Sequence, residues 1–180
     1  FALSLMMWLA VLIYWLESFM ARMEGMQPMV LPLAAICTIL PVLTGTLKGA
    51  LQAFEEIAEK RVRNFSGAVV RDQQMAHVTL GEMQINTRAA SELARAVYAR
   101  IEEGLPALAF TVEDRLAAKG HAAFISKLCR DTVNAMMAAS GASSYHDEQP
   151  IQRIWRDLNT VASHAFWDWD VTREQTGRHH

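Results

Sequence analysis

Apolar residues recur at helical spacing along most of the chain. Between residues 71 and 103 the apolar positions stand three, four or seven apart: Ala76, Leu80, Met83, Ala90, Ala94, Val97 and Ile101. This spacing places them on one face of a helix. Comparable stripes begin near residues 32, 111 and 150, and no segment shows the alternation that is typical of a β-strand. The pattern predicts long amphipathic helices and no sheet.

Residues that start and stop helices divide these stripes. Gly104 and Pro106 end the stripe of residues 71–103, and Thr111 with Asp114 forms a capping box for the next helix. Pro150 stands at a first helical position, where a missing N–H costs little. Its helix is expected to run to about residue 172. The sequence therefore predicts an all-α fold, an antiparallel four-helix bundle over residues 28–175.

The first 25 residues form a separate hydrophobic segment, which predicts an extra N-terminal helix over residues 2–23. Residues 2–16 carry no charge, and Glu17 interrupts the run. A membrane-spanning helix needs about 20 apolar residues. Three interpretations stay open: a membrane anchor, a packing helix, or a segment removed from its natural context. We do not expect the bundle itself to associate with a membrane.

The charge balance and the cysteines exclude several classes of protein. The chain has 17 basic and 19 acidic residues and a net charge of −2, so nothing indicates a nucleic-acid partner. Cys37 and Cys129 lie in apolar stretches without a partner motif, which argues against a disulfide or a cysteine metal site. The histidines form no metal-binding pattern. We expect a reducing compartment, and therefore a cytoplasmic protein without a metal.

Residues 143–170 carry the candidate chemistry. On one continuous helix, His164 would share a face with Asp157, Thr160 and Trp167. A histidine beside a carboxylate acts as a general acid or base, or is simply a hydrogen-bonded residue of the bundle. His146 lies in the preceding polar loop, and such a loop is either a site or an ordinary solvated connection. Spacing alone does not separate these alternatives.

Three tryptophans fall in the same part of the chain: Trp155, Trp167 and Trp169. Large aromatic side chains usually anchor a core or an interface. They also form the walls of sites that bind aromatic ligands. Both interpretations of the tryptophans stay open at this point.

Three stretches together resemble a known family: "PMVLPLAAICTILPVLTGTLKGALQAFEEIAEKR", "GEMQINTRAASELARAVYARIEEG" and "QPIQRIWRDLNTVASH". They are similar to the C-terminal helical domain of the acyl-CoA dehydrogenase superfamily. The resemblance is closest to its flavin-dependent monooxygenase branch, which includes two-component aromatic hydroxylases and dibenzothiophene monooxygenase. It covers residues 28–172, and "PIQRIWRDLNTVASH" is its most specific part. Residues 1–25 do not resemble the β-domain that precedes this bundle in the family.

The resemblance implies roles for three residues. His164 falls where the monooxygenase branch places a histidine beside the flavin, which helps to form and protect the oxygenated flavin or acts as acid or base. Arg63 falls where the superfamily has an arginine that reaches the flavin phosphates of a neighbouring subunit. Gln74 falls near a glutamine that supports the same cofactor. Ser66 departs from the usual aromatic residue in this segment.

His146 marks a difference from the dehydrogenases of the superfamily. It stands where many of them are expected to have a glutamate within a Tyr-Glu-Gly triplet, whereas this chain has Tyr145, His146 and Asp147. Asp147 or Glu148 would replace that carboxylate only from a shifted position. The resemblance therefore favours the monooxygenase branch, with His164 and His146 as the candidate catalytic residues.

The function implied by the resemblance is that of the oxygenase component of a two-component flavin-dependent monooxygenase. Such a protein uses reduced FMN or FAD from a separate flavin reductase, and O2, to oxygenate an aromatic or sulfur-containing small molecule. It is expected to be a homotetramer, and the 180-residue chain alone is expected to be inactive. Two alternatives are an FAD oxidoreductase similar to acyl-CoA dehydrogenases, and a non-enzymatic helical module held at a membrane by residues 1–20.

Overall fold

The computed structural model describes residues 30–62, 67, 69–104 and 110–179, and the side chains from residue 33 onward within these ranges. The chain divides into two compact units, Phe1–Ala35 and Ile36–His180. The predicted helix over residues 2–23 and the predicted flavin residue Arg63 lie outside the described residues.

Five α-helices account for most of the described residues: α2 (Val30–Lys60), α3 (Gln74–Gly104), α4 (Val112–Ser140), α5 (Pro150–Ala162) and α6 (Trp169–His179). Short 3-10 helices join them: η1 (Val70–Asp72), η3 (Ala142–Tyr145) and η4 (Ala165–Trp167). The described residues contain no strand apart from one isolated bridge between Val62 and Val69. This confirms the prediction of an all-α fold.

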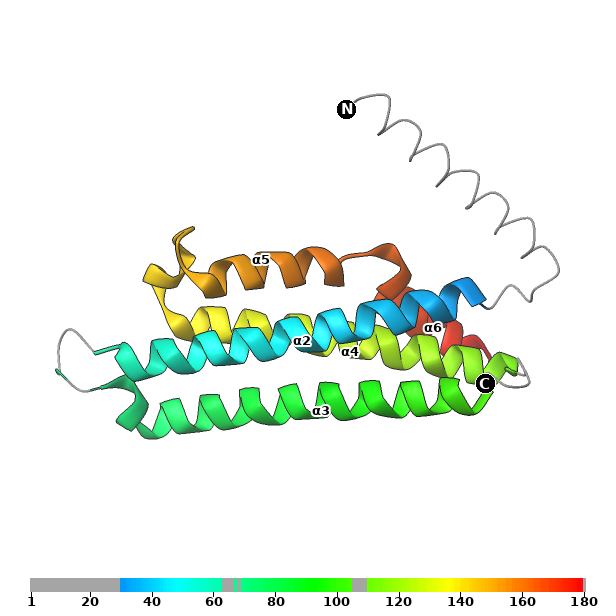
Figure 1. Ribbon diagram of the computed structural model, residues 1–180, viewed down its shortest axis with the longest axis horizontal. Helices are drawn as coiled ribbons and strands as arrows, with labels where there is room; N and C mark the ends of the chain where they lie inside the picture. Colours follow the sequence, from blue (N-terminus) through cyan, green and yellow to red (C-terminus); the bar gives the residue numbers. More distant parts are fainter. Residues whose placement is uncertain (1–29, 63–66, 68, 105–109, 180) are drawn as a thin grey trace, which may run out of the picture. The chain divides into compact units, whose positions relative to one another are not determined.

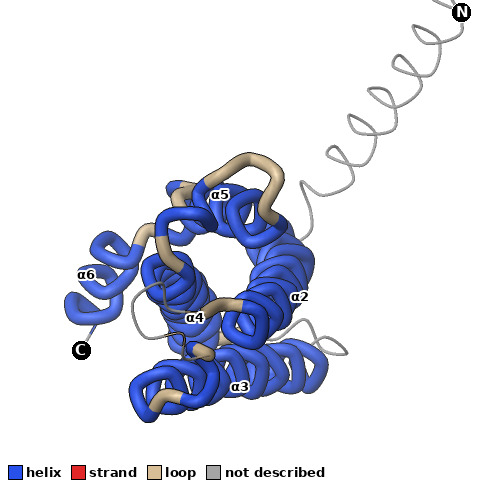
Figure 2. The backbone as a smooth tube through the Cα atoms, turned by 90° about the vertical axis from the view of Figure 1, so that its left-hand side faces the viewer, coloured by secondary structure: helices blue, strands red, loops and turns tan. Residues whose placement is uncertain are grey.

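Consecutive long helices of the second unit run in opposite directions (Figure 1). Helix α4 packs against α3, α5 and α6, so it is the central helix of this unit. Figure 2, which looks along the helices, shows α4 among its neighbours and α6 on its outer side. The arrangement agrees with the predicted antiparallel bundle, to which the structure adds the short helix α6.

The core is formed by the apolar stripes that the sequence predicts. In α2 the buried positions recur every three or four residues, and they are Ile36, Leu40, Leu43, Leu47, Ala50, Phe54 and Ala58. In α4 the buried apolar residues are Ala122, Ala123, Ile125, Cys129, Val133, Met136 and Met137. By length and composition, residues Leu33–Lys60 of α2 would suffice to cross a membrane. A helix at the centre of a protein core has the same composition, and the regular burial of α2 is that of a core helix.

The stripe of α3 is also buried, with two additions. Met83, Ala90, Ala94, Val97 and Ile101 are buried as predicted, and Thr87 and Ser91 complete the face. The hydroxyl of Thr87 donates to the carbonyl of Met83 at 2.8 Å, and that of Ser91 donates to the carbonyl of Thr87 at 2.9 Å. These bonds satisfy the hydroxyls inside the helix, so polar residues can occupy core positions.

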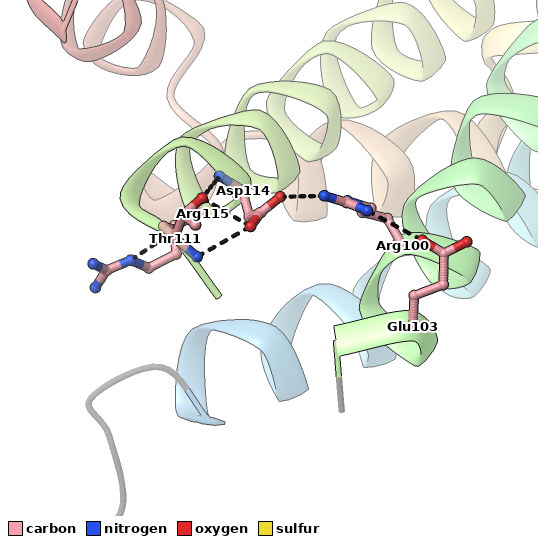
Figure 3. A network of polar contacts seen from close by, with 5 residues as sticks. All are labelled: Arg100, Glu103, Thr111, Asp114 and Arg115. Atoms are coloured by element: carbon pink, nitrogen blue, oxygen red, sulfur yellow. Dashed lines mark hydrogen bonds and ion pairs between the residues drawn. The ribbon is translucent and has the colours of Figure 1, made fainter. Parts of the chain in front are cut away.

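The start of α4 is fixed by the predicted capping box. The backbone N–H of Asp114 donates to Thr111 Oγ1 at 3.0 Å, and the backbone N–H of Thr111 donates to Asp114 Oδ2 at 3.0 Å. Arg100 of α3 donates to the other carboxylate oxygen of Asp114 at 2.9 Å and also pairs with Glu103 (Figure 3). These contacts tie the start of α4 to the last turns of α3.

The prediction of one continuous helix from Pro150 to about residue 172 is wrong. Helix α5 ends at Ala162, and a break of six residues that contains η4 precedes α6. The N–H of Ser163 is shared between the carbonyls of Asn159 and Thr160, and Ser163 Oγ donates back to the carbonyl of Asn159 at 2.8 Å. Such local bonds tighten and end a helix. The apolar spacing continues across the break and therefore does not reveal it.

Candidate functional site

His164 lies in the break between α5 and α6, in extended conformation with φ −66° and ψ 132°. Its Nδ1 accepts a hydrogen bond from the backbone N–H of Phe166 at 3.2 Å, which caps η4. A neutral imidazole that accepts at Nδ1 carries its proton on Nε2. His164 therefore presents an Nε2–H donor, and in its neutral form it is not a base at Nε2.

The predicted helical face that joins His164 to Asp157 is wrong, although Trp167 does line the same cavity as His164. Asp157 lies on α5, where it is near Arg153 and Arg156 at 3.8 and 3.9 Å. Because α5 ends before Ser163, the spacing of three, four and seven residues no longer places these side chains together. The surroundings of His164 come from α4 and from the segment before α6.

His164 lines a cavity of about 280 Å³ between α4 and the connection from α5 to α6. The lining residues are Ser126, Lys127, Arg130, Ala162, Ser163, His164, Trp167, Asp168, Trp169 and Asp170. His164 is exposed, whereas Ser126 is only 1% exposed. The lining of the cavity therefore includes both an exposed histidine and a buried serine.

Ser126 is unusual among the buried hydroxyls of α4. Thr132 and Ser140 donate to the carbonyls four residues before them, each at 2.7 Å. Ser126 Oγ is buried and has no hydrogen-bond partner within the described part of the chain. A buried polar atom without a partner costs free energy.

Two tryptophans line the same cavity. Trp167 is buried, and Trp169 is half-buried with its ring 5.7 Å from that of Phe124. Trp155 has a different role, since its Nε1–H donates to Asn134 Oδ1 at 2.6 Å and joins α5 to α4. The two predicted roles of the tryptophans are thus divided between an anchor and two cavity walls.

His146 lies at the other end of α5. It is exposed in the loop before Pro150, and its carbonyl accepts from the N–H of Gln149 at 3.0 Å. The 13 residues of α5 separate it from His164, which corresponds to about 20 Å along the helix axis. The two candidate catalytic histidines therefore cannot meet the same small substrate within one chain.

Gln74 also lies far from His164. It is the exposed first residue of α3, near the end of α2, where the N–H of Val70 donates to the carbonyl of Arg61 at 2.9 Å. Arg61 in turn donates to the carbonyl of Ala139 near the end of α4, at 3.1 Å. From Ala139 to Arg130, which lines the cavity of His164, α4 rises by about 14 Å.

A second cavity, of about 270 Å³, lies at this end of the unit. It is lined by Arg61, Arg71, Gln73 and His77 together with apolar residues that include Phe54 and Leu80. Arg71 is paired with Glu59 at 2.5 Å. Gln73 lines this cavity and Gln74, which by the family resemblance falls near a cofactor-binding glutamine, does not.

The donors around His164 fit a ligand ring that carries oxygen and nitrogen acceptors. The edge of a flavin ring presents such acceptors, and the Nε2–H of His164 would supply a donor. The described residues contain no cluster of three or more metal-ligating side chains. Sequence reasoning found His164 but missed Ser126, because a serine within an apolar stripe gives no sign of whether its hydroxyl is satisfied.

Comparison with known proteins connects these features to a family. Residues 37–169 match the model of the "Acyl-CoA dehydrogenase, C-terminal domain". The chain is 33% identical over 144 residues to a pigment production hydroxylase of Rhodococcus sp. (strain ATCC 21145). It is 31% identical over 139 residues to the oxygenase component of p-hydroxyphenylacetate 3-hydroxylase of Acinetobacter baumannii. These matches cover 80% and 76% of this chain but only 37% and 33% of the relatives.

Solved structures show the same arrangement of helices. The HsaA monooxygenase from M. tuberculosis superposes with a TM-score of 0.70 at 26% identity, over 82% of this chain and 38% of that one. The 3-HSA hydroxylase from Rhodococcus sp. RHA1 superposes with a TM-score of 0.71 at 26% identity, over 81% and 38%. The chain thus spans little more than a third of the length of the proteins that it matches.

Proposed function

We propose that this chain, which belongs to the family of acyl-CoA dehydrogenase C-terminal domains, is the helical part of the oxygenase component of a two-component flavin-dependent monooxygenase. The relatives support this proposal, since one is a hydroxylase and another is the oxygenase component of a hydroxylase. The observation that carries it is the fixed imidazole of His164, which presents an Nε2–H donor and lines a cavity together with Trp167 and Trp169. The substrate class that we propose is a small aromatic or sulfur-containing molecule.

His164 orients a donor in this proposal. The N–H of Phe166 occupies Nδ1 and fixes the ring, so that Nε2–H points away from the backbone it caps. A fixed donor stabilises negative charge that develops on oxygen during the reaction, without reorganisation of solvent. With Nδ1 occupied in this way, neutral His164 acts as a hydrogen-bond donor at Nε2 rather than as a base.

Reduced flavin, when bound, supplies the activation of O2, and this chain supplies binding and exclusion of water. Trp167 and Trp169 would cover one side of the cavity and limit access of water to the reacting atoms. His164 would donate to an acceptor atom within it. We propose that this flavin is reduced FMN or FAD. We infer that a separate reductase delivers it.

The family resemblance also underlies our proposal that Gln74 and Arg63 bind flavin phosphates of a neighbouring subunit. Gln74 lies at the end of α4 that is remote from His164, so a flavin ring beside His164 does not place its phosphates there. We propose a tetramer in the cytoplasm. One protomer would contact the flavin ring near His164, and another would contact the phosphates near Gln74. His146 lies at the same end as Gln74, and its proposed catalytic role stays a prediction.

A reductase-coupled assay tests the proposed function. The protein is purified as its natural gene encodes it. It is mixed with a flavin reductase, NADH, O2 and a panel of phenols, in parallel reactions with FMN and with FAD. We expect hydroxylated product that requires the reductase, and we expect the 180-residue chain alone to give none. Oxidation of an acyl-CoA without O2, or product formation independent of flavin, would contradict the proposal.

A further inference from the structure

Lys119, near the start of α4, is a half-buried lysine whose partners are neutral. Its Nζ donates to Gln175 Oε1 at 2.8 Å and lies over the ring of Phe166, 5.7 Å from the ring centroid. An ammonium at this distance is attracted by the negative face of an aromatic ring. Within the described part of the chain Lys119 forms no ion pair, whereas Lys60 and Lys127 each pair with a carboxylate four residues away.

The two partners of Lys119 come from elements that follow the break after α5. Phe166 belongs to η4 and Gln175 to α6, which lies on the outer side of α4 (Figure 2). A lysine ammonium has three donor hydrogens, so the bond to Gln175 leaves its charge available to the ring. The rings of Phe124 and Trp169, 5.7 Å apart, form a second contact between α4 and α6. Lys119 thus connects both η4 and α6 to the same helix.

Phe166 connects Lys119 to the imidazole of His164. The backbone N–H of Phe166 donates to His164 Nδ1 at 3.2 Å, and the ring of Phe166 meets that of Trp167 edge-on, with the centroids 4.6 Å apart. Trp167 is buried, so the ring of Phe166 has a fixed neighbour in the core and a cation over its face. Because 3.2 Å is at the long end of the range for hydrogen bonds, a small displacement of Phe166 would break its contact with Nδ1.

We propose that Lys119 is a positioning residue for His164: its ammonium fixes Phe166, and Phe166 fixes the ring orientation and the Nε2–H tautomer of His164. Neither Lys119 nor Phe166 lines the cavity of His164, so Lys119 acts through Phe166 and not on a ligand. The inference deepens the proposed function, on which it rests only for the statement that His164 acts in oxygenation.

NMR of the 180-residue chain tests the positioning without flavin or turnover. In Lys119→Met the side chain keeps an unbranched apolar stem but loses its charge and its donors. At a pH at which the imidazole is neutral, the wild type should show an unprotonated Nδ1 and a protonated Nε2 for His164. In Lys119→Met the two ring-nitrogen signals should move towards each other, because the two tautomers mix. The amide of Phe166 should exchange with solvent about tenfold faster.

Three further variants show whether the ammonium acts through the ring of Phe166. Lys119→Arg keeps a cation and a donor, and it should restore the wild-type signals. Phe166→Leu keeps the backbone N–H but removes the ring, so the addition of Lys119→Met to it should cause little further change. Lys48→Met, on an exposed position of α2, is the control for loss of a positive charge. Circular dichroism establishes that every variant is folded.

The reductase-coupled assay on the full-length protein separates positioning from a purely structural role. Lys119→Met should lower the fraction of reduced flavin that yields product by about tenfold, because the donor of His164 is displaced. The KM for the phenol should stay unchanged, since Lys119 does not line the cavity. Lys119→Arg should recover most of the product, and Lys48→Met should equal the wild type.

The outcomes distinguish failure of the positioning from failure of the proposed function. Unchanged His164 signals in Lys119→Met, an equal change in Lys48→Met, or no recovery in Lys119→Arg would overturn the positioning. His164 signals that depend on Lys119, in a protein without flavin-dependent oxygenation, would support the positioning and contradict the proposed function. Flavin-dependent oxygenation with His164 signals that do not depend on Lys119 would do the reverse.

Discussion

At the scale of single residues, Asp114 shows how a local contact sets a property that can be measured. Hydrogen bonds from the Thr111 hydroxyl and backbone N–H, followed by those from Arg100, lower the pKa of the Asp114 carboxyl below its ordinary value of 3.8. A carboxyl whose pKa is lower in the folded state stabilises the fold fully above the unfolded value. That stabilisation is lost as the pH falls through the lower, folded-state pKa.

Replacement of Asp114 should therefore change the response to acid. In Asp114→Asn the side chain keeps an oxygen that can cap α4 but has no charge for Arg100 to contact. We expect the decline of the melting temperature between neutral pH and about pH 2 to be shallower than in the wild type. Asp147→Asn, in the exposed loop before α5, is the control. If the melting temperatures of the wild type and of Asp114→Asn fall equally steeply with pH, Asp114 does not contribute to the acid response.

The two cysteines should differ in reactivity. Burial raises the pKa of the Cys129 thiol to about 12, and it also raises the pKa of the half-buried Cys37 thiol. At pH 8 only about one in ten thousand Cys129 thiols would be the reactive thiolate. We expect iodoacetamide to label Cys37 at least a hundredfold faster, and Cys129 only after unfolding, as read by peptide mass spectrometry. Equal labelling rates in the folded protein would show that Cys129 is not protected.

Single residues were predicted well wherever the signal is local. Thr111 and Asp114 form the expected capping box because both partners lie within one turn of each other. His164 was found by resemblance, but its tautomer depends on the N–H of Phe166, whose position follows from a break that spacing does not show. Ser126 could not be found from sequence, because an unsatisfied hydroxyl is a property of packing.

At the scale of elements, helix existence was predictable and one helix end was not. Burial at every third or fourth position identifies α2, α3 and α4, since a core face requires that periodicity. The end of α5 depends on hydrogen bonds of Ser163 with Asn159 and Thr160, which compete with continuation of the helix. Trp167 is buried although it follows the break. Its position in the sequence therefore still fits the apolar spacing of a continuous helix.

The junction after α4 makes a testable prediction about an element end. Gly141 follows α4 with a φ of +83°, and a Cβ there would lie 2.5 Å from Arg61 Nη2. Gly141→Ala should lower the free energy of unfolding by about 1–3 kcal/mol, chiefly through backbone strain. Denaturant unfolding measures the change.

Two further variants separate strain from contact at this junction. Arg61→Ala in the Gly141→Ala background should recover only a small part of the loss, because the guanidinium can move whereas φ cannot. Gly120→Ala is the control inside α4, where nothing lies within 4 Å of the new Cβ and alanine favours a helix. Equal stability of Gly141→Ala and the wild type would contradict the proposed strain.

At the scale of the whole molecule, the family and the all-α fold were predictable, whereas the arrangement of the site was only partly so. The stretch "PIQRIWRDLNTVASH" carries the resemblance that the match of residues 37–169 confirms. Helix α5 separates His146 from His164 in space, and the sequence alone does not show this separation. This separation leaves His164 and its cavity as the centre of the proposed chemistry, with Gln74 and His146 at the far end.

The most direct test of this account is the fraction of reduced flavin that yields product rather than hydrogen peroxide in His164 variants. His164→Asn retains a side-chain acceptor for the N–H of Phe166, but its amide is too short to place an N–H where Nε2–H stands. In the reductase-coupled assay, we predict that product formation falls about a hundredfold in His164→Asn and that hydrogen peroxide increases, while the melting temperature stays unchanged. His164→Gln, whose longer side chain can place its amide N–H nearer that position, should recover part of the product. Wild-type coupling in His164→Asn would contradict the central claim that the Nε2–H of His164 acts in the reaction.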